Sequence, residues 1–283
     1  MKVLMIGAHQ DDNEFRCGGL AHKLIKMGHE VRFLSMCNGC GGHHIMTPEE
    51  TVKRRAGESA AVAQLLGIQY DVWDIDDCSL VADLDTRRRL IRYIREFVPD
   101  LVVSHRLNDY HADHRAVGLL VQDASYMLTV PHECSDVPAM RRMPVIMYNE
   151  DHFRNPDFRA DLVLDMDDEI EIKLQIAHLN VSQVYEWLPY NHEEEVPENE
   201  ADRFEWLKGI KITEATTDEE ILNAKRGYSV RFAKPAARFR KQLIEYYGEE
   251  RGKKIRYAEA YEICEYGAPY DGIVKKVLEE ARA

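Results

Sequence analysis

The sequence has no apolar run that approaches the roughly 20 residues needed to span a bilayer. Its start also lacks the basic segment and apolar core of a secretory signal. Positive charge is in deficit, with 37 Lys and Arg against 50 Asp and Glu and a formal net charge of −13. This balance argues against nucleic acid or an anionic membrane as the main partner. We therefore expect a cytoplasmic protein without a membrane span, whose partner is a small neutral or cationic molecule.

Cysteine is sparse as well, because six cysteines in 283 residues are too few for a disulfide framework. We expect these thiols to be reduced. Cys37 and Cys40 have the spacing of a redox or zinc pair, and His43 and His44 follow closely, but no second C-x-x-C completes a zinc site. We favour two thiols that fill a glycine-rich loop, with a structural zinc as the alternative.

Strand-like and helical segments alternate through the first half of the chain. Repeated strand, helix and strand units predict a mostly parallel sheet with helices on both faces. The expected strands are 2–7, 30–36, 70–75, 100–104 and 144–148, and the expected helices are 15–27, 48–66, 85–97 and 115–127. The predicted fold class is therefore α/β, with a Rossmann-like three-layer core.

The pattern changes after about residue 161. A short strand is expected at 162–164, a long helix at 169–187, an acidic loop at 189–202 and further helices near 219–230, 235–247 and 272–282. We interpret residues 1–165 as the catalytic core and residues 166–283 as a helical extension packed on it, in one structural unit. The oligomeric state, a homo-oligomer included, stays open at this point.

Two polar clusters each follow a predicted strand. The strand at 2–7 ends in Gly7-Ala8-His9-Gln10-Asp11-Asp12-Asn13-Glu14, and His111-Ala112-Asp113-His114 follows the strand at 100–104. Ligands of open parallel sheets bind beyond the carboxyl ends of the strands. If the two strands are neighbours, both clusters enter one crevice and form a metal-dependent catalytic site.

The residue types in the clusters suit a catalytic zinc site, which usually has three protein ligands and one open position. His9, Asp12 and His114 supply that set. Asp11 is left over and is our candidate general base, because it could take a proton from water at the ion. Two imidazoles favour zinc over magnesium, and ferrous iron or cobalt remain alternatives. The competing interpretation is an Asp-Asp pair that caps a helix and histidines that lie at the surface.

His111 and Asp113 suggest a second proton-handling unit. A carboxylate that accepts a hydrogen bond from the ring would fix His111 and favour its charged form. That imidazolium could stabilise an oxyanion and protonate a departing amine, so the constellation suits amide hydrolysis.

Both motifs resemble those of the PIG-L/LmbE-like zinc-dependent de-N-acetylases, which carry an A-H-P-D-D-E type motif and an H-x-D-H motif. Further matches are Cys17-Gly18-Gly19, Asn38-Gly39, Arg55 with Glu58, and Tyr257-Ala258-Glu259-Ala260. The resemblance implies the same roles: zinc bound by His9, Asp12 and His114, Asp11 as base, and His111 assisting with Asp113 behind it. It also implies removal of an acetyl group from an N-acetylglucosamine-type sugar or conjugate.

The sequence departs from the family pattern at Gln10, where proline is usual, and at Asn13, which shifts the following acid by one place. Substrate-binding candidates carry less specific signals. They are Arg55, which could bind a sugar hydroxyl or phosphate, Asp77 beyond the third strand, Asn38 after the second strand, and Tyr110 beside the second motif.

Two other classes of protein compete with the hydrolase. A metal-stabilised binding protein without turnover would hold the ion but would not need Asp11. A nucleotide-binding Rossmann enzyme fits the fold pattern alone, but no G-x-G-x-x-G follows the first strand, and His9 and Gln10 stand where the pyrophosphate would bind.

Overall fold

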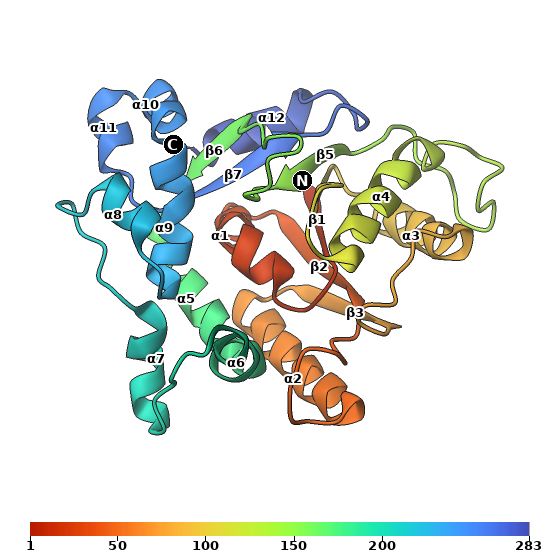
Figure 1. Ribbon diagram of the computed structural model, residues 1–283. Helices are drawn as coiled ribbons and strands as arrows, with labels where there is room; N and C mark the ends of the chain where they lie inside the picture. The colour runs from red at the N-terminus through yellow and green to blue at the C-terminus, as the bar shows by residue number, and fades with distance from the viewer. Residues whose placement is uncertain (283) are drawn as a thin grey trace.

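The computed structural model describes residues 1–282 and is built around a seven-stranded mixed sheet (Figure 1). The strands are β1 (Lys2–Gly7), β2 (Glu30–Cys37), β3 (Gln69–Ile75), β4 (Leu101–Ser104), β5 (Val145–Asn149), β6 (Leu162–Asp165) and β7 (Ala258–Ile263). Their order is β3-β2-β1-β4-β5-β7-β6, parallel from β3 to β5 and antiparallel where β7 pairs with β5 and β6. The predicted α/β class and all five core strands are confirmed.

Helices cover both faces of this sheet. Those of the first half are α1 (Asp12–Lys26), α2 (Pro48–Leu66), α3 (Leu84–Phe97) and α4 (Ala112–Met127). The later ones are the 3-10 turn η1 (Asp167–Glu169), α5 (Ile170–Leu179), the π-helical turn η2 (Ser182–Trp187), α6 (Leu188–His192), α7 (Glu200–Lys208), α8 (Asp218–Asn223), α9 (Tyr228–Arg238), α10 (Arg240–Tyr247), α11 (Glu249–Lys254) and α12 (Gly272–Glu280). Within the described residues, no helix is both long and apolar enough to cross a membrane.

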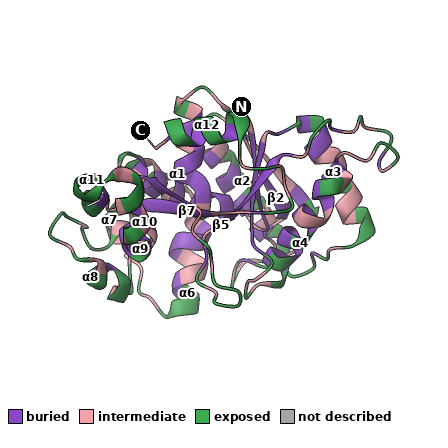
Figure 2. Ribbon diagram, turned by 90° about the horizontal axis from the view of Figure 1, so that it is seen from above, coloured by how far each residue is buried: buried purple, intermediate pink, exposed green. Residues whose placement is uncertain are grey.

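The core lies between the sheet and its two helical layers. Successive residues of a strand point to opposite faces. Val3 and Met5 of β1 therefore pack against α1, α2 and α12, whereas Leu4 and Ile6 pack against α3 and α4. Figure 2 shows the buried sheet between the two layers. Such two-sided burial explains why the core strands are continuous apolar runs.

The second part of the chain differs from its predicted form in three respects. It contributes β7, which inserts between β5 and β6, so it is not purely helical. The single long helix expected at 169–187 is instead α5 followed by η2, with a break at Asn180. The acidic segment expected as a loop contains α6 and the start of α7. The sequence did not predict β7, because Glu259 and Glu262 interrupt the apolar pattern of this strand.

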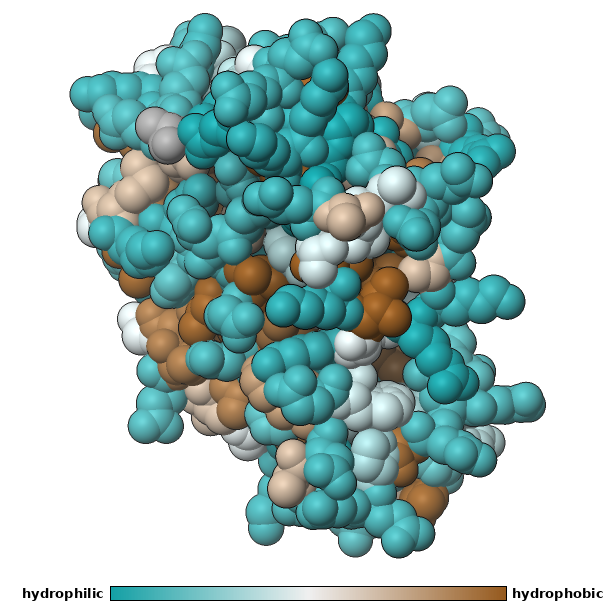
Figure 3. Space-filling model, turned by 90° about the vertical axis from the view of Figure 1, so that its left-hand side faces the viewer, coloured by the Kyte–Doolittle hydropathy of each residue, from teal (hydrophilic) through white to brown (hydrophobic). Residues whose placement is uncertain are grey.

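The C-terminal helices form one side of the molecule, where α8 to α11 lie together at the left of Figure 1. Hydrophilic side chains cover most of that side, and an apolar band crosses its middle (Figure 3). At the centre of the sheet, β1 pairs with β4, although β2 and β3 separate the two in sequence. This is a topological switch point, where the carboxyl ends of neighbouring strands open a crevice.

Candidate metal centre

The two polar clusters meet at this switch point, as their positions after β1 and β4 predicted. His9, Asp11 and Asp12 occupy the turn from β1 into α1, which is held by the Asp12 carboxylate accepting hydrogen bonds from the backbone N–H groups of Ala8 (3.0 Å) and His9 (2.9 Å). The turn also needs Gly7, because a Cβ there would lie 2.8 Å from that of Asp12.

Three ligand atoms converge within this crevice. Nδ1 of His9 lies 3.7 Å from Oδ2 of Asp12, and Nε2 of His114 lies 3.4 Å from Oδ1 of Asp12. All three residues are well buried, and their ligand atoms lie within 4.8 Å of one another. Two imidazoles and a carboxylate are a donor set that suits zinc.

A carboxylate stands behind each of the two histidines. Nε2 of His9 donates to Asp113 at 3.0 Å, and Nδ1 of His114 lies 3.0 Å from Asp109. Metal-binding histidines usually use their second ring nitrogen in this way, which fixes the tautomer and points the other nitrogen at the ion. Sequence reasoning missed Asp109, because a lone aspartate in a loop carries no spacing signal.

Charge at the centre also favours a cation. Burial lowers the pKa of His9, but the hydrogen bonds to Asp113 and Asp12 and the charges of Asp12 and Asp77 outweigh it and raise this pKa to about 10. The carboxylates therefore strongly favour positive charge at this position, which an imidazolium or a divalent ion can supply. The residues present thus fit a divalent cation.

His105, which follows β4, is a further member of the site that the sequence did not indicate. Its ring stacks on that of His114 with centroids 4.3 Å apart, and its Nε2 lies 3.2 Å from Oδ2 of Asp12 and 3.3 Å from the backbone nitrogen of Ala8. Burial lowers the pKa of His105 to about 4, so the ring is neutral. Burial opposes ionisation of Asp12, but His114 and His105 outweigh it and hold the pKa of Asp12 well below its usual range.

Asp11 precedes α1 with an unusual backbone conformation. Its φ is +116°, a region that non-glycine residues rarely adopt and that is found mostly at functional sites. The carboxylate lies 3.4 Å from Nη2 of the buried Arg55. Burial raises the pKa of Asp11, and Arg55 offsets part of this rise. Glu14 is fully buried and accepts from the Asp11 backbone, so it does not reach the cavity as a second base.

The structure corrects the predicted pairing of His111 with Asp113. His111 caps α4, and its Nδ1 accepts a hydrogen bond from the Asp113 backbone (3.2 Å). The same nitrogen lies 3.8 Å from Oδ2 of Asp113, which is too far for a hydrogen bond to the carboxylate. The Asp113 carboxylate instead binds His9 and the backbone N–H of Cys78. Burial, together with His9 and His114, lowers the pKa of His111, so the structure favours neutral imidazole rather than imidazolium.

The four substrate-binding candidates lie in different places. Arg55 lines the cavity but is 2% exposed and is directed at Asp11. Asp77 accepts from the backbone N–H groups of Gly39 and Gly41 and so holds the glycine-rich loop. Asn38 binds Asp76 and the Cys40 backbone, and it is not among the described residues that line the cavity. Tyr110, 73% exposed, stands at the cavity beside His111 and His114.

All six cysteines are free, as expected. Cys37 is buried, and burial raises the pKa of its thiol, so the thiolate that would bind a metal is disfavoured. Its sulfur could nevertheless join His9 and Asp77 around an ion. That no structural zinc binds at Cys37 and Cys40 stays a prediction.

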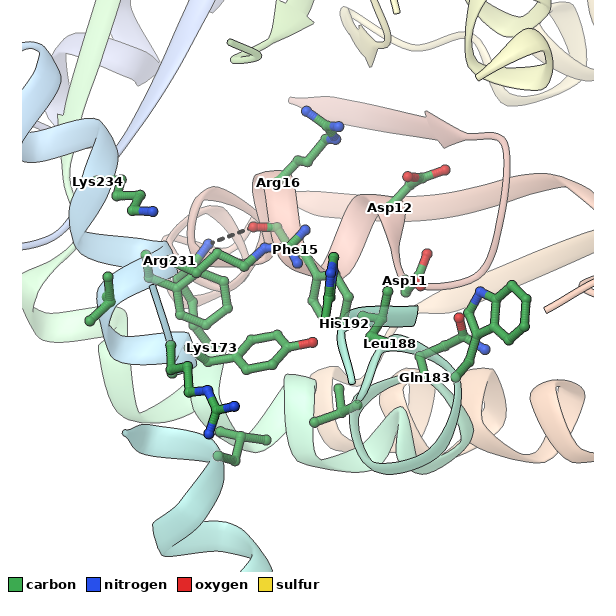
Figure 4. Close-up of a pocket in the computed structure, with 18 of the residues that line it drawn as sticks. Asp11, Asp12, Phe15, Arg16, Lys173, Gln183, Leu188, His192, Arg231 and Lys234 are labelled. Atoms are coloured by element: carbon green, nitrogen blue, oxygen red, sulfur yellow. Dashed lines mark hydrogen bonds between the residues drawn. The ribbon is translucent and has the colours of Figure 1, made fainter. Parts of the chain in front are cut away.

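One large cavity connects the metal centre with the second part of the chain. Its volume is about 1150 Å³, and its walls come from the β1–α1 turn, the start of α4, α5 to α7, and α9 (Figure 4). Trp187, Trp206 and Tyr228 add aromatic surface. A space of this size and mixed lining suits a small molecule larger than an acetyl group.

Residues 4–125 match the family model described as PIG-L: GlcNAc-PI de-N-acetylase. The resemblance seen in the two motifs is thereby confirmed by a PIG-L family match over this first part of the chain. In sequence, it is 26% identical over 196 residues to the 4-oxalmesaconate hydratase of Pseudomonas putida, a match that covers 66% of this chain and 76% of the hydratase.

Solved structures share the fold. The N,N'-diacetylchitobiose deacetylase of Pyrococcus horikoshii is similar with a TM-score of 0.65 and 22% identity, covering 94% of this chain and 84% of that one. The 4-carboxy-2-hydroxymuconate hydratase GalB of Pseudomonas putida KT2440 is similar with a TM-score of 0.67 and 20% identity, covering 93% and 95%. The match to the PIG-L family model and the hydratase relative support an enzyme.

Proposed function

We propose that this protein is a zinc-dependent hydrolase that removes an N-acetyl group from an amino sugar or its conjugate. The position of Asp11 carries the proposal. Its carboxylate lines the same cavity as His9, Asp12 and His114, yet among the described residues it belongs to none of the groups that could hold an ion. A carboxylate so placed can serve as a general base.

His9, Asp12 and His114 would hold the zinc ion, and Asp113 and Asp109 would orient the two imidazoles. When bound, zinc would lower the pKa of a water molecule and polarise a carbonyl group. The PIG-L family match and the donor set at this position support the choice of metal.

The side chains around this centre would transfer protons and stabilise the developing negative charge. Asp11 takes a proton from the water as the water oxygen bonds to the acetyl carbon. Arg55 favours the ionised form of this carboxylate and holds it in place. Nδ1 of His111 accepts a backbone hydrogen bond, so the proton lies on Nε2, which donates to the acetyl oxygen as negative charge develops there. The C–N bond then breaks, the amine takes the proton that Asp11 holds, and acetate and a free amine leave.

A screen of N-acetylglucosamine and its conjugates, reading released acetate and free amine, tests this proposal. The zinc-loaded wild-type protein should release both products in equal amounts, and Asp11→Asn should release neither at a comparable rate. Zinc binding without turnover of any N-acetylated sugar would favour the binding protein that we kept as an alternative.

A hydratase is the second candidate, and the 26% identity to the 4-oxalmesaconate hydratase favours it. In that reaction Asp11 would take a proton from the water whose oxygen bonds to one carbon of a carbon–carbon double bond, and would return a proton to the other carbon. Mass spectrometry separates the two candidates, because a hydratase yields one product heavier by one water and releases no acetate.

A further inference from the structure

The cavity has a basic end that the proposed chemistry does not use. Helix α9 forms part of its wall and directs Arg231, Lys234 and Arg238 into it, because residues three and seven positions apart share a helix face. Figure 4 shows Arg231 and Lys234 on one side of the cavity and Asp11 on the other.

Most cations of the cavity wall already have partners. Arg238 pairs with Glu150, Arg16 donates to the Glu150 backbone, Arg55 pairs with Asp11, Lys173 with Glu259 and Arg226 with Glu194. Within residues 1–282, three side chains line the cavity with neither a hydrogen bond nor an ion pair. They are those of Arg231, Lys234 and the exposed Lys225 in the loop before α9. Unpaired positive charge therefore collects at the α9 end.

Arg231 is nonetheless held in position. Its guanidinium lies 4.7 Å from the ring centroid of Phe15 on α1 and 5.6 Å from that of Tyr228. Contacts of this kind with aromatic faces restrain a cation without neutralising it. A cation that is already placed loses little conformational entropy when it binds an anion.

We propose that Arg231 and Lys234 form a subsite for an anionic group of the substrate, a carboxylate or a phosphate. This rests on the proposed function, because the same molecule would present its reacting carbon to Asp11 at the other end of the cavity. The overall charge of −13 had favoured a neutral or cationic partner. The local field of a cavity, however, is set by the charges that line it.

Direct binding tests the subsite without turnover. Glutarate and glycerol 3-phosphate are titrated by calorimetry into the zinc-loaded protein, with glutaramide and glycerol as neutral counterparts. At least one anion should bind more tightly than its neutral counterpart. The anion that does so shows whether the subsite prefers a carboxylate or a phosphate. Arg231→Gln or Lys234→Gln should weaken that binding about 10-fold or more, the usual loss for a charge-assisted hydrogen bond. Lys241→Gln on α10, outside the cavity lining, should change it less than about 2-fold.

Carboxylates could also bind at the zinc ion. The double variant Arg231→Gln/Lys234→Gln therefore measures the anion binding that does not depend on the subsite. Arg231 is exposed, and unchanged thermal unfolding of each variant would show that the fold is retained. Equal affinity of wild type and double variant for both anions would overturn the subsite, as would neutral analogues that bind as tightly as the anions.

Turnover separates this inference from the proposed function. Anion binding that depends on Arg231, without cleavage of any N-acetylated sugar, would leave the subsite standing and remove the deacetylase. Cleavage of neutral and anionic N-acetylated sugars with equal kcat/KM, in both wild type and double variant, would support the deacetylase and remove the subsite.

Discussion

Nε2 of His9 and Oδ2 of Asp113 lie 3.0 Å apart, so the aspartate of the second motif holds the histidine of the first. The two residues are 104 positions apart in the chain. Asp113 is fully buried and also accepts from the Cys78 backbone, which fixes the carboxylate from a third segment. The two motifs therefore form one unit, and loss of Asp113 should disturb the metal centre.

Asp113→Ala should weaken zinc binding by roughly 10- to 100-fold, as is typical when the carboxylate behind a histidine ligand is removed. Competition with a chelator of known affinity measures this change. Asp74→Ala, a highly exposed carboxylate elsewhere, is the control and should bind zinc like the wild type. Full zinc affinity in Asp113→Ala, with activity lost, would contradict this account. It would support the role that the sequence suggested, in which Asp113 orients His111.

Arg55→Met should move the acidic limb of the kcat/KM profile to higher pH. Arg55 lowers the pKa of Asp11, so its removal raises that pKa, and the ionised base is then lost at a higher pH than in the wild type. Arg54→Met is the matched control, because it removes a neighbouring, more exposed guanidinium that pairs with Glu58 rather than with Asp11. An unshifted limb in a zinc-loaded Arg55→Met would mean that Arg55 does not act through Asp11.

Sequence patterns predicted the first half of the fold well, because each core strand is a continuous apolar run and the intervening helices carry clear caps. Thr47 caps α2, for example, and Gly67 ends it with φ of +67°. The same patterns placed His9, Asp12 and His114 together through the rule for strand ends. They failed for β7, because its acids Glu259 and Glu262 pair with groups on distant elements and interrupt the apolar pattern.

The residues that the sequence missed act through contacts that have no local signal. Asp109 and His105 matter because they face His114, and neither spacing nor composition reveals that arrangement. The sequence also paired Asp113 with the wrong histidine. The cap of α4 uses the His111 nitrogen that the Asp113 carboxylate was expected to bind. Likewise, only tertiary packing brings Arg231 into the wall of the cavity that also holds the metal centre.

His178 should make the fold sensitive to acid. Its Nδ1 lies 2.7 Å from the hydroxyl of Tyr185, and burial lowers its pKa, so the ring is neutral in the folded state. The unfolded chain binds a proton near pH 6.5. Above that pH the neutral ring retains its full contribution to stability, and as the pH falls through the folded pKa this contribution is lost, at no more than about 1.4 kcal/mol per pH unit.

Urea unfolding at pH 7.5 and pH 5 measures this effect. The free energy of unfolding of the wild type should exceed that of His178→Gln at pH 7.5, and the difference should narrow at pH 5. His132→Gln, at an exposed position, should keep a constant difference from the wild type. A difference for His178→Gln that does not change with pH would rule out this role.

Acetate release by the zinc-loaded Asp11→Asn variant tests the central claim most directly. Asn keeps the shape of the side chain but cannot accept a proton at neutral pH, so zinc content should stay at one ion per chain. The rate should fall by about 10² to 10⁴-fold, the usual contribution of a general base, with little change in KM. Wild-type acetate release by this variant would contradict the account, and loss of zinc would show that Asp11 is a ligand instead of the base.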